Sequence, residues 1–361
     1  MSLPYCLLTE ILTNPERSSA LTLVQWETLV RQARAAQLLV RLATVLAEHG
    51  LLESAPSKPG RHLNAALRLR DRQRQAVRWE VEHLLAAFRH ANIPLVLLKG
   101  AAYEMADLPP GRCRVFSDFD VLVPHKVIPD IELALMMHGW SSTHQNAYDQ
   151  RYYRTWMHEL PPMRHIKRLS VIDVHHALVP VTARLRPATE KLLANKVACP
   201  SHPEISVLSG PDMILHSAVH LFSDGEFDNA LRDLFDLQDL TAHFIKTDAH
   251  WHALIIRANE LNLSLPLYYA LRYLKRCLHT NVPPEALNAL KTVAPGKLVS
   301  RLLDGIFERG LLPNNETCRD RLSAPARMAL YIRGHSLRMP LHLLVPHLTR
   351  KALMRMNLLP E

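Results

Sequence analysis

The sequence predicts an α+β fold, in which a small mixed β-sheet with packed helices lies between N-terminal helices and a C-terminal helical domain. Three observations lead to this prediction. Apolar residues recur at helical spacing in residues 1–92, short apolar runs bounded by glycine and proline dominate residues 93–186, and helical patterns prevail in residues 187–361. We therefore expect three parts with these boundaries, in a chain of 361 residues that is long enough for more than one domain.

The N-terminal part contains two helical patterns. Residues 21–49 carry apolar side chains at helical spacing, and the pattern stops at Gly50. A linker rich in serine, proline and glycine follows at residues 53–60, and a longer helical pattern then runs from about Leu63 to His90. One face of this second helix is crowded with arginines. Such a face is usually solvated and paired with acids, although in a basic chain it can also contact phosphates.

The central part begins with a short buried strand that enters a glycine turn. Pro94 ends the preceding helix, and the apolar run after it leads into Lys99 and Gly100. A short helix is expected over residues 101–107, and a second strand over residues 117–123. Glycine allows a close approach of the backbone, and the free N–H groups at a helix start bind anions, so this turn is a candidate phosphate site.

A helix over residues 125–139 and three more strands complete the central part. We expect the strands at residues 140–145, 157–167 and 169–179, where apolar runs are bounded by turn residues. Beyond about residue 187 the strand signals fade, and we expect helices to dominate to the end.

Two aspartates, Asp118 and Asp120, stand among apolar neighbours in the second predicted strand. Residues two apart on a strand share a face and lie about 7 Å from each other. Carboxylates held together repel unless a cation lies between them, and Mg²⁺ binds through one or two carboxylates together with substrate phosphates. The alternative is an exposed strand edge on which the acids oppose aggregation, but the strongly apolar flanks disfavour it.

A third aspartate, Asp173, lies in another apolar run, just before His175 and His176. A two-metal site for phosphoryl transfer needs a further carboxylate of this kind. A buried carboxylate without a partner is costly, which makes a purely structural reason difficult to find. The remaining structural alternative is a salt bridge to Arg164 or Arg168.

Composition narrows the class of protein. The formal net charge is +9, which favours an anionic partner such as a nucleotide or a nucleic acid, although solubility alone also accounts for it. The five cysteines are scattered without a CxxC pair, so neither a disulfide framework nor a zinc ribbon is indicated. No apolar run is long enough for a membrane span, and no secretory signal is evident, so we expect a cytoplasmic protein.

The motifs LLKG, SDFDVLV and IDVHHAL together resemble the nucleotidyltransferase superfamily that includes DNA polymerase beta and the aminoglycoside nucleotidyltransferases. They are most similar to a bacterial family of uncharacterised nucleotidyltransferases. The resemblance implies Mg²⁺-dependent transfer of a nucleoside monophosphate from a triphosphate such as ATP to an acceptor hydroxyl, with release of pyrophosphate. It implies that Asp118, Asp120 and Asp173 are catalytic and hold two Mg²⁺ ions, or Mn²⁺, and that Asp173 takes the proton of the acceptor. The nucleotide-binding residues that it implies are Lys99, Gly100, Arg114, Ser117, His175 and Asp233.

One departure from the superfamily leaves alternatives open. A serine usually follows the glycine of the turn, whereas this chain has Ala101. The acceptor is a small molecule or RNA, and a toxin that modifies tRNA would belong to the second group. A binding or scaffold protein that kept the fold without catalysis is the alternative from a different class. Protein partners are not predicted.

The helical C-terminal part offers weaker signals. His216 and His220 have the spacing of zinc ligands on a helix, but no third ligand is evident from the sequence. Arg232, Asp233 and Asp236 either line the cleft or brace a helix.

Overall fold

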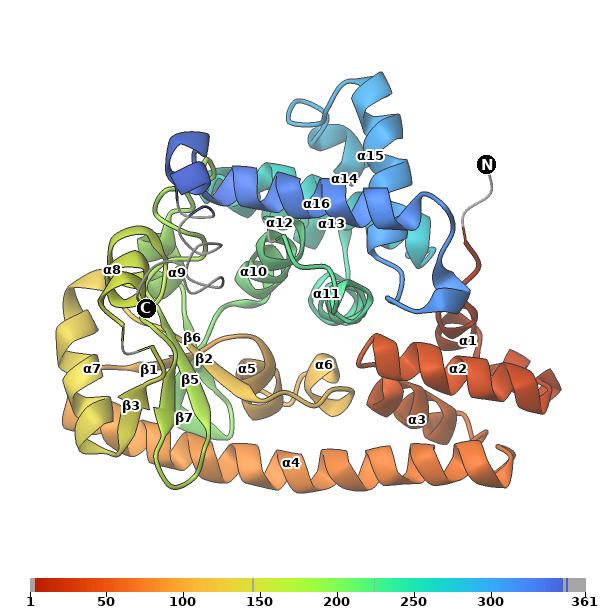
Figure 1. Cartoon of the computed structure of the whole chain (residues 1–361), viewed down its shortest axis with the longest axis horizontal. Helices are drawn as coiled ribbons and strands as arrows, with labels where there is room; N and C mark the ends of the chain where they lie inside the picture. The colour runs from red at the N-terminus through yellow and green to blue at the C-terminus, as the bar shows by residue number, and fades with distance from the viewer. Residues whose placement is uncertain (1–3, 145, 224, 347–348, 350–361) are drawn as a thin grey trace.

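The computed structural model describes residues 4–144, 146–223, 225–346 and 349, and it confirms the α+β prediction. A mixed sheet of seven strands occupies one half of the molecule, and helices surround it (Figure 1). The strands are β1 (Leu95–Leu97), β2 (Asp118–Leu122), β3 (Trp140–Ser142), β4 (Met163–His165), β5 (Val171–His175), β6 (Val197–Cys199) and β7 (His202–Val207). Their order in the sheet is β3-β4-β5-β2-β1-β7-β6.

Helices precede, interrupt and follow these strands. Those up to the end of β4 are α1 (Leu7–Thr13), α2 (Leu23–Ala35), α3 (Leu39–Glu48), α4 (Ser57–His90), α5 (Lys99–Met105), α6 (Pro109–Arg112), α7 (Ile128–Met137) and α8 (Ala147–Trp156). Those after β5 are α9 (Thr189–Ala194), α10 (Gly210–Ser223), α11 (Ala230–Phe244), α12 (Asp248–Glu260), α13 (Ser264–Cys277), α14 (Pro284–Ala289), α15 (Lys297–Gly310) and α16 (Ser323–Arg338). Short 3₁₀ helices cover Pro15–Ala20, His125–Val127 and Glu316–Cys318. The helix expected over residues 21–49 is divided between α2 and α3, at Gln37 with φ 54°.

Two strands, β6 and β7, lie where we expected helices to dominate, and that expectation was wrong for residues 197–207. β7 pairs in parallel with β1, and β6 pairs antiparallel with β7. Strand β7 contains Pro203 and Glu204, and its strand conformation depends on pairing with β1, about 100 residues earlier. The sheet therefore runs beyond residue 186, where we placed the end of the central part.

Helix α4 supports both the sheet and the N-terminal helices. It extends along the whole lower side of the view in Figure 1 and contacts α3, α5, α7 and β1. Its apolar face is buried, whereas Arg74 and Arg78 both donate to Glu104 on α5, over 2.9 and 3.1 Å. Because these arginines are paired with a buried acid, this part of the arginine-rich face braces α5.

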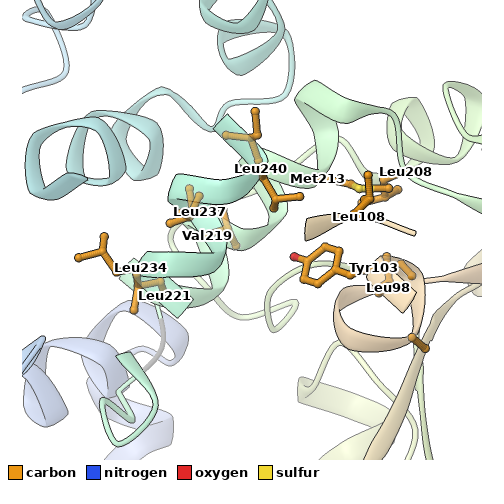
Figure 2. Close-up of a cluster of buried hydrophobic side chains, with 14 of the residues drawn as sticks. Leu98, Tyr103, Leu108, Leu208, Met213, Val219, Leu221, Leu234, Leu237 and Leu240 are labelled. Carbon is orange, nitrogen blue, oxygen red and sulfur yellow. The ribbon is translucent and has the colours of Figure 1, made fainter. Parts of the chain in front are cut away.

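The helices that follow the sheet pack on the segment that joins β1 to β2. Figure 2 shows Tyr103 of α5 and Leu108 near side chains of α10 and α11, in one buried cluster. Helix α11 also contacts α6. These apolar contacts hold α10 and α11 over the end of the sheet that carries the aspartates. Among the described residues, no helix is long and apolar enough to cross a membrane.

Candidate active site

Strand pairing brings the predicted aspartates together. β2 and β5 are parallel neighbours, and their register pairs Asp120 with Asp173 and Leu122 with His175. Because side chains alternate along a strand and paired residues point the same way, Asp118, Asp120, Asp173 and His175 share one face of the sheet. The residues between them point to the opposite face and are buried in the core: Phe119, Val121, Ile172 and Val174.

Asp120 is buried and bound by two nitrogen atoms. Its Oδ1 accepts from Nζ of Lys99 and contacts Nε2 of His175, each at 2.8 Å. Burial alone would raise the pKa of Asp120, but the positive charge of Lys99 and the hydrogen bond from His175 outweigh it and hold the pKa well below its usual value. Asp120 is therefore ionised.

Lys99 is the first residue of α5, just after β1, and reaches Asp120 from there. It adopts a positive φ of 46°, which is rare for a side chain of this size. Burial opposes its charge, but Asp120 and Asp118 outweigh burial and raise the pKa of Lys99. Gly100 follows, and a Cβ added there would lie 2.7 Å from Cγ of Phe116. In the structure a larger side chain at this position would collide with Phe116, whereas we expected the glycine to let the backbone approach a phosphate.

Asp173 lacks the salt bridge that was the alternative explanation for it. Its Oδ1 is buried and has no hydrogen-bond partner in the part of the chain that the structure describes. Arg168 instead binds Glu80 at 2.8 Å, and Arg164 is exposed on β4. Burial, followed by the charge of Asp120, raises the pKa of Asp173 from 3.8 to about 7. This carboxyl therefore keeps its proton more readily than an ordinary aspartate, and a cation would stabilise its ionised form.

Two residues that the sequence did not identify, His158 and Glu159, complete this side of the site. Oε2 of Glu159 lies 3.3 Å from Nδ1 of His175, and the ring centres of His158 and His175 are 5.2 Å apart. Burial would lower the pKa of His175, but Asp120 and Glu159 outweigh it and raise the pKa. Glu159 belongs to no motif, and only its pairing with β5 brings it here.

Three other predicted nucleotide-binding residues lie outside the strands that carry the aspartates. Arg114 is buried and donates to Oδ2 of Asp236 on α11 over 2.6 Å. Asp233, also on α11, accepts from Arg232 at 3.0 Å. Ser117 is exposed immediately before β2. Arg114 therefore ties the loop before β2 to α11, and these three residues are not joined to Asp120 by hydrogen bonds among the described contacts.

Helix α10 contributes two histidines on the side of Lys99. The charge of Lys99, followed by burial, holds the pKa of His220 well below its usual value, and burial followed by Lys99 lowers that of His216 to about 3. His220 Nδ1 also lies 3.9 Å from Asp233. In the described part of the chain these histidines do not join a group of three metal-ligating side chains. The described residues therefore offer no third ligand for a zinc ion bound to His216 and His220.

A face with three carboxylates and a lysine is of the kind that binds phosphate esters together with divalent cations. Residues 22–279 match the family model described as uncharacterised nucleotidyltransferase, so the chain belongs to that family. The family supports nucleotidyl transfer in general as the activity of the chain. No curated protein and no solved structure is significantly similar to it.

Proposed function

We propose that the protein transfers a nucleoside monophosphate from a nucleoside triphosphate, such as ATP, to an acceptor hydroxyl and releases pyrophosphate. The observation that carries the proposal is the register of β2 and β5, which sets Asp173 beside Asp120 on the face that also bears Asp118. Family membership supports the reaction class.

The residues of this face fit Mg²⁺ or Mn²⁺. The buried Oδ1 of Asp173 has no hydrogen-bond partner among the residues that the structure describes, and this is a position where a cation would stabilise the ionised carboxylate. Asp118, Asp120 and Asp173 would hold the ions. Bound there, the ions would neutralise the charge of the triphosphate and of the departing pyrophosphate.

Lys99, His175 and Asp173 would each have a separate function in the reaction. Lys99 supplies a positive charge beside Asp120 and would bind a phosphate oxygen. His175 fixes the orientation of Asp120 through its hydrogen bond. Asp173, which lies beside Asp120 on the same face, would accept the proton of the acceptor hydroxyl. Most of the rate enhancement would come from positioning and charge neutralisation.

The acceptor is a small molecule or RNA, and the net charge of +9 is compatible with either anionic partner. The test uses ATP and the other triphosphates labelled at the α- or the γ-phosphate, with Mg²⁺ and a cell extract that supplies acceptors. We expect label from the α-position, and none from the γ-position, in an acceptor that is then identified by its size and nuclease sensitivity.

Asp118→Asn should abolish labelling, whereas Asp130→Asn, on the exposed surface of α7, should leave it unchanged. Transfer of the γ-label would identify a kinase instead. If no label is transferred and no triphosphate raises the melting temperature in Mg²⁺, the protein is a silent member of the fold.

A further inference from the structure

We propose that His158, Glu159 and His175 form a binding site for a transition-metal ion of the zinc type, separate from the aspartates assigned to Mg²⁺. Their ligand atoms all lie within 4.8 Å of one another, and no other group of three or more such side chains does so in the part of the chain that the structure describes. The two histidines are buried and Glu159 is partly buried, so this is not a surface cluster.

The distances between the ligand atoms suit a tetrahedral ion. Oε2 of Glu159 is 3.3 Å from Nδ1 of His175 and 4.0 Å from Nε2 of His158. Metal–ligand bonds of about 2.0–2.1 Å at tetrahedral angles place ligand atoms about 3.3–3.4 Å apart. The first pair already has this separation, and the second must close by less than about 1 Å. The two imidazole nitrogens, which lie within 4.8 Å of each other, must also approach when the ion binds.

Main-chain pairing fixes the three positions. Glu159 forms an antiparallel bridge with His175, and the N–H of His176 donates to the carbonyl of His158 over 2.8 Å. The ligands therefore come from strand β5 and from a segment paired with it. A site built on paired strands holds its ligands more accurately than a site on loops.

Asp120 prepares His175 for this function. Its ionised carboxylate can only accept, so Nε2 of His175, at 2.8 Å, carries the hydrogen. Nδ1 then faces Glu159, and an ion that binds there would replace the proton that Nδ1 carries when the ring is charged. A carboxylate that holds the far nitrogen of a ligating histidine is the usual outer partner in metal sites, where it fixes the tautomer and the ring orientation.

The donor set identifies the class of ion. Two imidazoles and one carboxylate suit Zn²⁺ and its transition-metal neighbours, whereas Mg²⁺ prefers oxygen ligands alone. The three aspartates do not form an equally compact group among the described residues. That wider spacing suits ions that share their coordination with phosphates. The same sheet face thus offers two chemically different cation sites, joined through the hydrogen bond between Asp120 and His175.

The test is metal binding by the full-length protein after EDTA treatment, without nucleotide and with excess Mg²⁺ to fill the aspartate site. Titration with Co²⁺, followed by visible absorption, and with Zn²⁺, followed by calorimetry, should give one equivalent bound. His158→Gln should weaken this binding at least about tenfold, because it removes a ligand. Asp118→Asn should leave it intact, and His176→Gln is the matched control, since that neighbouring ring packs on His125 instead.

The assignment is wrong if the wild-type protein binds neither ion in excess Mg²⁺, or if Asp118→Asn abolishes binding while His158→Gln retains it. Circular dichroism reports whether each variant is folded, and Glu159→Gln replaces His158→Gln if the latter is not. Because no nucleotide is present, a negative result here leaves the proposed transfer reaction untouched, and a failure of that reaction leaves this site untouched.

Discussion

Replacing Asp173 by asparagine should stabilise the protein at neutral and alkaline pH. Burial and the nearby charge of Asp120 raise the pKa of Asp173 from 3.8 to about 7, and no described residue forms a hydrogen bond with its buried Oδ1. Its ionised form is therefore less stable in the folded protein than in water. Asparagine has the same shape as the protonated acid and carries no charge, so the variant avoids this penalty.

The size of the effect follows from the pKa difference. Between about pH 4 and pH 7 the folded protein keeps a proton that the unfolded chain has already lost, so the free energy of unfolding decreases as the pH rises. At 1.36 kcal/mol per pKa unit, a difference of about three units corresponds to about 4 kcal/mol. Because the carboxyl is partly exposed to solvent, we expect about 1–3 kcal/mol at pH 8 and less than about 0.5 kcal/mol at pH 4.

Urea unfolding followed by circular dichroism, in EDTA and at pH 4, 6 and 8, measures this difference. Asp118→Asn is the matched control, since it removes a carboxylate from the same strand face without relieving a buried unpaired oxygen, and its gain should be smaller. The reasoning is refuted if Asp173→Asn is no more stable than the wild type at pH 8, or if its advantage does not change with pH.

Three further substitutions test other contacts. Asp236→Asn should lower the free energy of unfolding in urea by about 3–5 kcal/mol, because it leaves the buried guanidinium of Arg114 without its ionic partner and removes one of the two carboxylates that bind Arg41. Asp239→Asn, which contacts Arg41 alone, should cost less. Gly100→Ala should lower the free energy of unfolding by about 1–3 kcal/mol in the same assay, because the added methyl group meets the ring of Phe116. Adding Phe116→Leu to this variant should restore part of the lost stability. Lys99→Met should weaken the binding of Mg²⁺–triphosphate at least about tenfold in calorimetry, through the loss of one charged hydrogen bond, and unchanged affinity would contradict its place in the site.

The acidic strand could be predicted because it depends on local pattern. An apolar run with Asp118 and Asp120 two apart specifies a strand that is buried on one face and acidic on the other, whatever lies next to it. The neighbour itself is set by tertiary structure. That Asp173 lies directly beside Asp120, and not one or two residues along the strand, depends on the register of β2 and β5, which no spacing in the chain encodes.

The parts that escaped prediction depend on partners distant in sequence. Glu159 lies within the strand that we expected over residues 157–167, but no feature of the sequence indicated that this segment pairs with β5 and so brings Glu159 to the site. Arg114 illustrates the reverse case. The family resemblance implies that it binds nucleotide, and in the structure its guanidinium donates to the carboxylate of Asp236, 122 residues later in the chain. This partner depends on the packing of α11, which no local pattern indicates.

Asp120 would connect the two proposed cation sites. Lys99 and His175 both contact its Oδ1, and in the proposed function its other oxygen, Oδ2, would bind an ion together with Asp118 and Asp173. His175 in turn directs its other nitrogen to Glu159. Loss of the Asp120 carboxylate would therefore free the histidine ring and remove an oxygen ligand together, whereas changes at Asp118 or Glu159 each act on one site alone. This asymmetry is why Asp118→Asn and Glu159→Gln, and not a variant of Asp120, separate the two proposals.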